Sequence, residues 1–387
     1  MGQRRSDELP TSAGAARQPR GRPMRMNGIA SSSAPRNQRG LTLVELLIAV
    51  TLGLIALAVM IGVFVANSQN YRQNDAITAL QDNARFAMDN LARDLAMAGY
   101  WGGVRPPDAV RDLLVSSTAA DAIRANDCGP ASAGSDSRWL LDPSLPVEFH
   151  NHLDSTSVGS RFRCLTAVQA NTDVLMVRRV SGASAIALDQ PTATSLTLGP
   201  GRYYVKTNQS SGSLFRAAAA SVNLADPADC PASDSGIAGG CPPQEQPVQV
   251  YAYVPRIYFV HDISGNIKVP TLCRYVLNDQ AATPAMEQEC LADGVENLQI
   301  EWGIDGDGDE LVDRYLAAPT ADELSQARSV RIHLLVRATE ERVQASDANK
   351  EYVLADYRSA EDSGFAQSGV LRRAFTTTVQ LKNMVSR

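Results

Sequence analysis

The chain has 387 residues, of which 44% are hydrophobic, so it can supply the core of one large domain or two ordinary ones and is not a disordered chain. Its formal net charge of -6 is unevenly distributed, because the first forty residues contain eight arginines against Asp7 and Glu8. The remainder carries 28 basic and 40 acidic residues, a formal charge of about -12. Because phosphate binding requires clustered Lys and Arg, this acidic body argues against nucleic acid as a partner.

The first forty residues are rich in Arg, Ser, Pro and Gly and show no apolar periodicity. We therefore expect an unstructured basic leader over residues 1–40. A start at Met24 or Met26 is an alternative, since it leaves a shorter basic leader that still ends in Arg39 and Gly40.

A long apolar run follows the leader. Leu46 to Ala66 gives 21 residues without a charge, about the length that crosses a bilayer core as a helix. Arg36 and Arg39 precede the run, so the positive-inside rule keeps the leader in the cytoplasm and exports everything after Ala66. An ordinary secretory signal has a shorter apolar stretch followed by a cut site, so any cut here is expected before the helix, leaving it attached.

The junction between leader and apolar run has a specific pattern. Gly40 is followed by Leu-Thr-Leu-Val-Glu-Leu-Leu-Ile-Ala, with basic residues ahead and about twenty apolar residues behind. This pattern resembles the class III signal of type IV pilins and of the pseudopilins of type II secretion. The resemblance implies that a membrane-embedded prepilin peptidase cuts between Gly40 and Leu41 and methylates the new N-terminus. Phenylalanine is commoner in the family at the position of Leu41, a departure that should be tolerated because the amine takes the methyl group.

Glu45 is the one carboxylate in this apolar stretch. A carboxylate at membrane depth costs roughly 2.5 to 3.5 kcal/mol on insertion scales, so it normally has a partner or a function. The resemblance implies that Glu45, the fifth residue of the mature chain, pairs with the N-terminal amine of Leu41 in a neighbouring subunit. The alternative is that Glu45 stays hydrated near the headgroups and recognises nothing.

The helical pattern continues past Asn67. Apolar residues recur at intervals of three or four and form one stripe: Ile77, Leu80, Ala84, Ala87, Leu91 and Leu95. The charged residues of this stretch are expected away from the stripe: Asp75, Asp82, Arg85, Asp89, Arg93 and Asp94. With Gly99 as the stop, the pattern predicts a helix from about Thr42 to Ala98 whose second half lies on a globular domain. A coiled coil is less well supported, because the stripe lasts only about three heptads.

Beyond Gly99 the sequence consists of short alternating runs between Gly, Pro, Ser and Asp clusters. The expected strands are Val174 to Val180, Val248 to Val254, Arg256 to Val260, Asn297 to Trp302, Val330 to Arg337 and Phe375 to Leu381. Residues 111–160 and 206–247 are expected to be long loops. The predicted class is α+β, with a mainly antiparallel sheet packed on the helix. The predicted organisation is a leader (1–40), a membrane-spanning or filament-core helix (41–66), its amphipathic continuation (67–98) and an exported β-rich domain (99–387).

Six cysteines lie in the predicted exported part, where oxidation is expected: Cys128, Cys164, Cys230, Cys241, Cys273 and Cys290. Six cysteines allow fifteen pairings. Short loop closure favours Cys230 with Cys241 and Cys273 with Cys290, which leaves Cys128 with Cys164. Free buried thiols are the alternative. No pair has the CxxC spacing of a zinc or redox site.

An acidic segment, Ile304 to Tyr315, has the spacing of a calcium loop. Its oxygen donors are expected at positions 1, 3, 5, 7 and 9, from Asp305, Asp307, Asp309, the Leu311 carbonyl and Asp313. A full EF-hand is excluded, because position 6 is Glu310 instead of glycine and position 12 is Leu316 instead of glutamate. Either a shorter Ca²⁺ loop or a solvated acidic turn between strands is consistent with the pattern.

Catalytic motifs are not found. The four histidines are expected to be structural or surface residues: His150, His152, His261 and His333. The sequence contains no GxSxG elbow, no P-loop and no HExxH motif. It therefore offers no reason to predict an enzyme, and no cofactor other than possible Ca²⁺ is expected.

Four segments of the body resemble the PilW family of minor pilins. They are AGYWGG (98–103), GVENLQIEWGID (294–305), SVRIHLLVR (329–337) and RRAFTTTVQLKN (372–383). The resemblance implies a minor pilin of the type IV pilus, in a complex that primes assembly at or near the tip. The implied partners are other minor and major pilins through the N-terminal helix, the prepilin peptidase and the bacterial inner membrane. The body is then expected in the periplasm and later in the fibre or its tip.

Two other functions remain open at this stage. A minor pseudopilin of type II secretion shares the signal and the helix, and gene neighbours would distinguish it. A membrane-anchored exported adhesin or enzyme is the alternative from another class, and it would retain residues 1–40.

Overall fold

The computed structural model describes residues 40–104, 110–112, 127–130, 139–153, 156–185, 195–199, 201–208, 212–217, 221–223, 248–264, 268–279, 284–339, 350–362 and 370–384. The chain divides into two compact units at the bond between Val65 and Ala66. The predicted pair Cys230 and Cys241 lies outside the described residues.

One long helix, α1 (Leu43–Ala96), begins one residue after the predicted start and ends two residues before the predicted end. Its most apolar 18-residue window has a mean hydropathy of 2.8 and no buried residue, so length and composition suit a membrane crossing. Thr42 caps the helix, because its Oγ1 accepts the backbone N–H of Glu45 at 3.3 Å. At the other end, Gly99 has a φ of +71°, the left-handed conformation that terminates helices.

The second half of α1 buries the predicted stripe. The buried residues are Leu80, Ala84, Ala87, Met88, Leu91, Asp94 and Leu95. Ile77 packs at the edge, beside Ala338, Val370 and Leu371. Asp94 contradicts the prediction that all the charged residues lie away from the stripe, since it is only 1% exposed.

The larger sheet has eight strands. In order across the sheet, six of these are β1 (Val110–Asp112), β6 (Gly212–Arg216), β5 (Tyr203–Thr207), β8 (Gln249–His261), β3 (Thr172–Val180) and β2 (Val147–Leu153). The other two form a branch, in which β9 (Thr271–Asn278) pairs with β8 and β10 (Ala285–Asp293) pairs with β9. Among the described strands, β1 and β6 form the one parallel pair. The predicted α+β class with a mainly antiparallel arrangement is confirmed.

A single strand, β8, replaces two predicted strands that were separated at Pro255. Pro255 has no N–H, so it fits where a strand edge has no ladder partner. On one side of β8, the pairing with β5 ends at Ala252 and the pairing with β9 begins at Arg256. Pro255 falls in the gap between them and still lies opposite Arg178 of β3. The proline therefore does not interrupt the strand.

The smaller sheet follows the predicted C-terminal strands, in the order β12 (Arg314–Leu316), β11 (Val295–Ile304), β13 (Ala327–Arg337) and β16 (Arg372–Gln380). The short helix α4 (Ala321–Ser325) starts with a capping box between Thr320 and Glu323. Alternate residues of β13, namely Val330, Ile332, Leu334 and Val336, form one buried face, but Leu335 on the other face is buried too. It packs with Tyr352, Leu354 and Tyr357, around β14 (Val353–Leu354) and β15 (Tyr357–Arg358).

The predicted loops contain secondary structure that the alternation pattern did not reveal. Residues 111–160 include part of β1, the 3-10 turn η3 (Trp139–Leu141), β2 and most of α3 (Val158–Arg161). Residues 206–247 include β6 and β7 (Ser221–Asn223), and β7 pairs with β4 (Ser195–Thr197). These elements are short, and the burial of β2 is intermediate throughout its middle, so their sequences lack a clear period.

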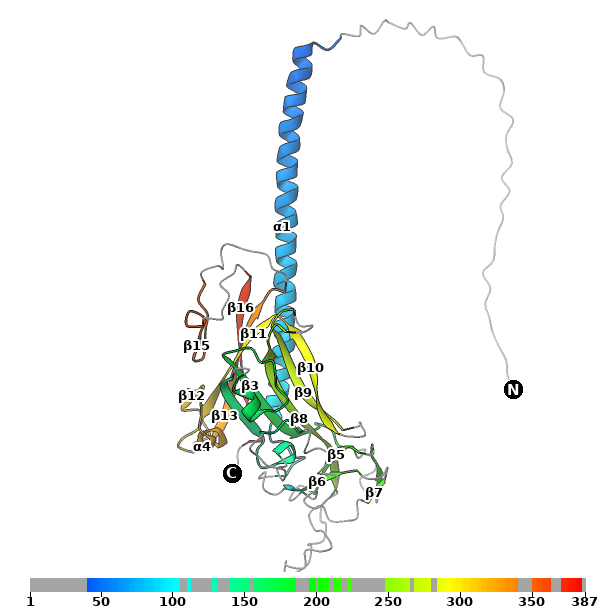
Figure 1. The fold of residues 1–387 in the computed structure, drawn as a ribbon, viewed down its shortest axis with the longest axis vertical. Helices are drawn as coiled ribbons and strands as arrows, with labels where there is room; N and C mark the ends of the chain where they lie inside the picture. The colour runs from blue at the N-terminus through cyan, green and yellow to red at the C-terminus, as the bar shows by residue number, and fades with distance from the viewer. Residues whose placement is uncertain are drawn as a thin grey trace, which may run out of the picture. The chain divides into compact units, whose positions relative to one another are not determined.

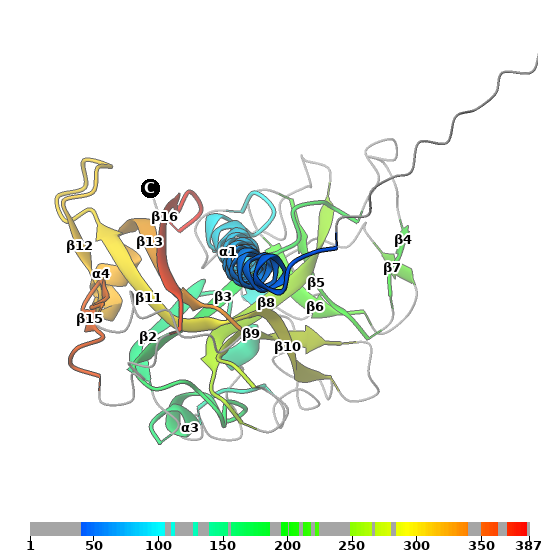
Figure 2. The same ribbon diagram turned by 90° about the horizontal axis from the view of Figure 1, so that it is seen from above.

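The second half of α1 and both sheets share one core. Leu91 and Leu95 of the helix, Tyr258 of β8 and Ile332 of β13 belong to the same buried cluster. Figure 1 shows the C-terminal part of α1 running alongside these strands, and Figure 2, seen along the helix, shows β16 and β8 both next to it. Because the helix packs against both sheets, its buried stripe is wide and includes Met88.

A buried carboxylate links the two sheets. Asp173 of β3 accepts the backbone N–H of His152 at 3.1 Å and that of Ile300, in β11, at 2.7 Å. Burial raises the pKa of Asp173 well above its usual value. The two N–H groups satisfy this side chain where water does not reach it.

Candidate functional site

The predicted processing site is open to solvent. Gly40 and Leu41 are both exposed, and Leu41 has 73% of its surface accessible. A Cβ added to Gly40 would meet nothing within 4 Å, so no packing contact in this structure requires glycine there.

Glu45 lies in the first turn of α1 and is exposed. A carboxylate in this turn is favoured by the partial positive charge of the helix N-terminus, by about 0.3–1 kcal/mol. The cap itself uses the backbone N–H of Glu45 and the Thr42 hydroxyl. The helix start thus depends on Thr42 and leaves the Glu45 carboxylate available for another partner.

The buried Asp94 is the centre of an ionic cluster that joins α1 to the larger sheet. Its carboxylate accepts hydrogen bonds from Arg179 of β3 at 2.7 Å, from Arg256 of β8 at 2.7 Å and from the Tyr258 hydroxyl at 2.5 Å. Burial opposes ionisation, but the two guanidinium charges and the hydroxyl outweigh it and hold the pKa of Asp94 below its usual value. Burial, together with the Asp94 charge, raises the pKa of Tyr258 to about 12.

The sequence reasoning missed this cluster although a signal was present. Asp94 follows Leu91 by three residues and Ala87 by seven, which is the spacing of the stripe itself. A charged residue in phase with an apolar face needs a buried partner. Arg179 fell in a predicted strand and Arg256 began another, yet nothing in the sequence indicated which strand would face the helix.

The acidic loop brings together three of its four aspartates. Carboxylate oxygens of Asp305, Asp307 and Asp313 all lie within 4.8 Å of one another, and no other such metal-type group occurs among the described residues. Asp309 is not in this group, and its Oδ1 accepts the backbone N–H of Leu311 at 2.8 Å. The chain curls at Gly308, whose φ is +83°.

Part of this acidic group is already engaged by the protein. Asp305 is 4% exposed, pairs with Arg328 at 2.7 Å and accepts the N–H groups of Gly308 and Glu310. Its burial opposes ionisation, but the Gly308 N–H and the Arg328 guanidinium outweigh it and lower the pKa of Asp305. Asp313 accepts the Gly306 N–H at 2.7 Å. The loop geometry is therefore maintained by protein contacts, and a cation would share Asp305 with Arg328.

Two of the predicted disulfides are present. Cys128 is bonded to Cys164, and Cys273 to Cys290, which joins paired positions of β9 and β10. Short loop closure favoured the pair Cys273–Cys290, and Cys128–Cys164 was the pair that the predicted closures left over. Their presence fits an oxidising compartment.

Each histidine contacts a neighbouring polar group. The pairs are His150 with Glu148, His152 with Gln299 and Asp356, His261 with Asp262, and His333 with Glu301 and Thr376. His150 and His152 lie in β2, whereas His261 ends β8 and His333 lies in β13. Among the described residues their contacts are with other polar groups and not with one another, which fits structural roles.

Comparisons with known proteins match both ends of the chain. The family described as type IV pilus-assembly protein W matches residues 257–383, and the prokaryotic N-terminal methylation motif matches residues 35–61. Pilin-like protein PilA3 of Thermus thermophilus is 41% identical over 66 residues, which cover 16% of this chain and 28% of that protein. The chain therefore spans less than a third of the length of this relative. No solved structure matches.

The family matches coincide with the features described above. The methylation motif covers Gly40, Glu45 and the start of the exposed apolar helix. The second match begins in β8 and includes all of the smaller sheet with the acidic loop. The order of these two matches along one chain, together with the long helix packed on antiparallel sheets, supports a type IV pilus minor pilin of the PilW kind.

Proposed function

We propose that this protein takes part in type IV pilus assembly within the priming or tip complex of minor pilins. Before assembly, a prepilin peptidase cuts between Gly40 and Leu41 and methylates the new amine. The observation that carries the proposal is the methylation motif over residues 35–61, directly ahead of a long apolar helix with no buried residue in its most apolar window. A helix with such a surface needs either lipid or other helices around it.

The same helix serves both environments in this proposal. In the inner membrane the apolar half of α1 is the single anchor and the body lies in the periplasm, as the arginines before Gly40 favour. On assembly the lipid is replaced by helices of other minor and major pilins. Glu45 then pairs with the Leu41 amine of a neighbouring subunit, which compensates its charge in an apolar bundle.

The ionic cluster at Asp94 supports a mechanical role for α1. A force applied to the helix in a fibre must be transmitted to the body, and Asp94 is tied to β3 and β8 by three side chains. Truncating one partner of such a buried set is costly, so the helix and body separate only with difficulty. The role proposed is therefore structural.

Deletion of the gene is expected to remove surface pili, and restoring it is expected to return them. A restored Gly40→Val variant should not return them, because the bulkier residue blocks the cut and the leader stays attached. Electron microscopy counts the pili, and mass spectrometry of the wild-type protein should find a methylated N-terminus at Leu41. Normal piliation in the deletion strain, at wild-type levels of the other pilins, would contradict the proposal.

Two alternatives are separated by specific observations. A minor pseudopilin of type II secretion would have the same processed N-terminus, but its deletion would abolish secretion and leave pili intact. A membrane-anchored adhesin or enzyme would retain residues 1–40, so finding Leu41 as the first residue excludes it.

We further propose that the acidic loop binds Ca²⁺ through Asp305, Asp307 and Asp313. The convergence of three carboxylates supports this, since hard cations prefer such oxygen donors. Saturating Ca²⁺ at about a hundred times its dissociation constant would stabilise the fold by about 2.7 kcal/mol, a melting shift of a few degrees.

Purified protein in detergent is accordingly expected to melt higher in millimolar Ca²⁺ than in chelator, whereas Mg²⁺ should substitute poorly. Asp307→Ala should remove most of the difference. Asp309→Ala is the matched control and should keep it, because Asp309 lies outside the three-carboxylate group. Superimposable melting curves would reduce the loop to an acidic turn held by Arg328.

A further inference from the structure

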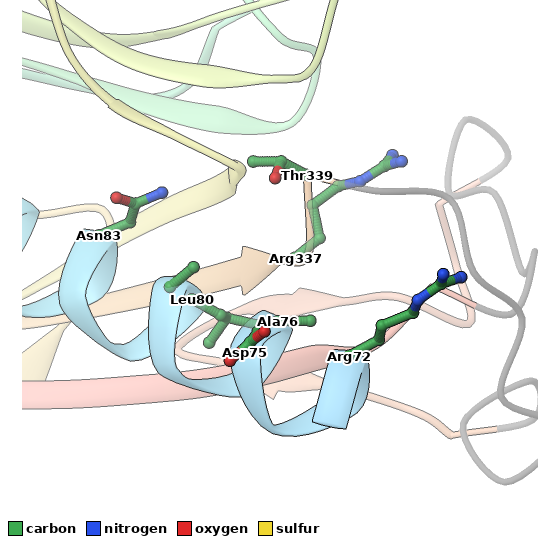
Figure 3. A pocket seen from close by; sticks show the side chains of 8 residues that line it. Arg72, Asp75, Ala76, Leu80, Asn83, Arg337 and Thr339 are labelled. Carbon is green, nitrogen blue, oxygen red and sulfur yellow. The ribbon is translucent and has the colours of Figure 1, made fainter. Parts of the chain in front are cut away.

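A pocket of about 220 Å³ lies between the second half of α1 and the end of β13. Figure 3 shows Arg72 and Asn83 reaching it from the helix and Arg337 and Thr339 from the strand side. Its volume is several times that of a water molecule, so it can admit a side chain from another protein. Neither the methylation motif (35–61) nor the Ca²⁺ proposal involves it.

Arg337 is the feature that makes this pocket unusual. The residue is only 8% exposed, and its Nε has no hydrogen-bond partner. Among the described residues, its one ion-pair partner is Glu296, with Arg337 Nη1 and Glu296 Oε1 3.9 Å apart. That carboxylate is already held by both Nε and Nη2 of Arg372, which is 2% exposed. Within the part of the chain that the structure describes, one carboxylate, 11% exposed, therefore faces two buried guanidinium groups, which leaves an excess of positive charge at Arg337.

The other charged groups lining the pocket do not neutralise the excess of positive charge. Arg72 adds a second positive charge, and Asp75, three residues later on the helix, offsets only one of the two. The Asn83 amide is occupied, since it donates to the Asp293 carbonyl at 3.0 Å. Because a buried cation without a full counter-charge is costly, the pocket is chemically complementary to an anion that enters from outside.

The position of the pocket decides between two sources of that anion. A phospholipid phosphate lies within the headgroup zone, which adds roughly 5 to 8 Å to each side of the hydrocarbon core. The helical residues of the pocket extend from Arg72 to Asn83, six to seventeen residues after Ala66, or about 9 to 25 Å of helix. Most of the pocket is therefore beyond the reach of a headgroup, and a protein carboxylate is favoured.

We propose that this pocket receives an Asp or Glu side chain of a neighbouring pilin-like subunit and binds it through Arg337 and Arg72. The inference rests on the proposed function, because assembly brings such a subunit alongside α1. A planar guanidinium pairs with a carboxylate in a defined orientation. The contact would fix the rotation of one subunit relative to the next, which an apolar helix bundle alone does not specify.

The test places a photo-crosslinking amino acid at Ala79, a small exposed residue that lines the pocket, in the full-length chain in piliated cells. Illumination is expected to join the protein to another pilin, at a peptide that contains Asp or Glu. Arg337→Gln and Arg72→Gln should each lower the yield of this adduct by roughly tenfold, the loss expected from one charge-assisted pair. Arg85→Gln, an exposed arginine of the same helix outside the pocket, is the matched control and should leave the yield unchanged.

Three outcomes would overturn the inference. They are an adduct with lipid, an adduct with the chain's own segment containing Glu340 and Glu341, and a pilin adduct whose yield neither arginine affects. Arg72 is exposed, so its variant reports on binding even if Arg337→Gln impairs folding. If the wild-type protein is required for pili but the adduct is insensitive to both variants, only this inference fails. If deletion leaves piliation normal, the proposed function fails with it.

Discussion

Replacing Asp94 with alanine is expected to lower the free energy of unfolding by about 3 kcal/mol. Removing one partner of a buried ion pair costs about 3–5 kcal/mol, because the other charge stays buried without compensation. Here Arg179 is left with a side chain only 9% exposed, whereas Arg256, at 23%, still reaches water, which favours the lower end of that range. Urea unfolding of the full-length protein in detergent, followed by the fluorescence of three buried tryptophans, measures the change: Trp101, Trp139 and Trp302.

Asp89→Ala is the matched control, since Asp89 is an exposed aspartate on the same helix, and it should change stability by less than about 0.5 kcal/mol. The pH dependence provides a second check. Because the pKa of Asp94 is lowered in the folded state, its stabilisation is complete above the unfolded value near 3.8 and is lost as pH falls through the lower folded value. The difference between wild type and Asp94→Ala should therefore narrow below about pH 4. Equal stability of the two proteins at neutral pH would show that the cluster does not hold the helix to the sheet.

Replacing Glu45 with alanine is expected to abolish entry of the protein into pili while leaving membrane insertion intact. Insertion should even become easier, because the carboxylate costs roughly 2.5 to 3.5 kcal/mol at membrane depth. The helix should still form, since its cap uses the Glu45 backbone N–H and the Thr42 hydroxyl. Fractionation of membranes and sheared pili, probed for the protein, measures both quantities in one strain.

Two further substitutions separate charge from helix capping. Glu45→Gln keeps the size of the side chain and removes its charge, so it should fail like alanine if an amine is the partner. Thr42→Ala weakens the cap by about 1 kcal/mol and should leave incorporation unchanged. Normal incorporation of Glu45→Ala would support the alternative that the carboxylate is only a hydrated residue in the first turn of the helix.

Local chemistry explains what could be predicted from the sequence. The apolar run after Gly40, the stripe from Leu80 to Leu95 and the alternation in Val330 to Val336 each depend on a period of one element, which is present in the chain before folding. The helix, the C-terminal strands and the α+β class were accordingly correct. The Cys273–Cys290 disulfide followed from short separation along the chain, and Cys128–Cys164 was then the pair left over. The methylation motif required only recognition of a contiguous pattern.

Only the tertiary structure decided which charged residues far apart in the sequence form ion pairs. Asp94 interacts with Arg179 and Arg256 across 85 and 162 residues, and nothing local to any of the three indicates the others. The same holds for Pro255, which a local rule treats as a strand boundary. It is tolerated because β5 and β9 happen to leave a gap beside it. Periodicity along the chain thus determines that a helix or strand buries one face, whereas the packing of these elements determines which residues that face contacts. The reason is that burial energies depend on partners that the chain brings together only on folding.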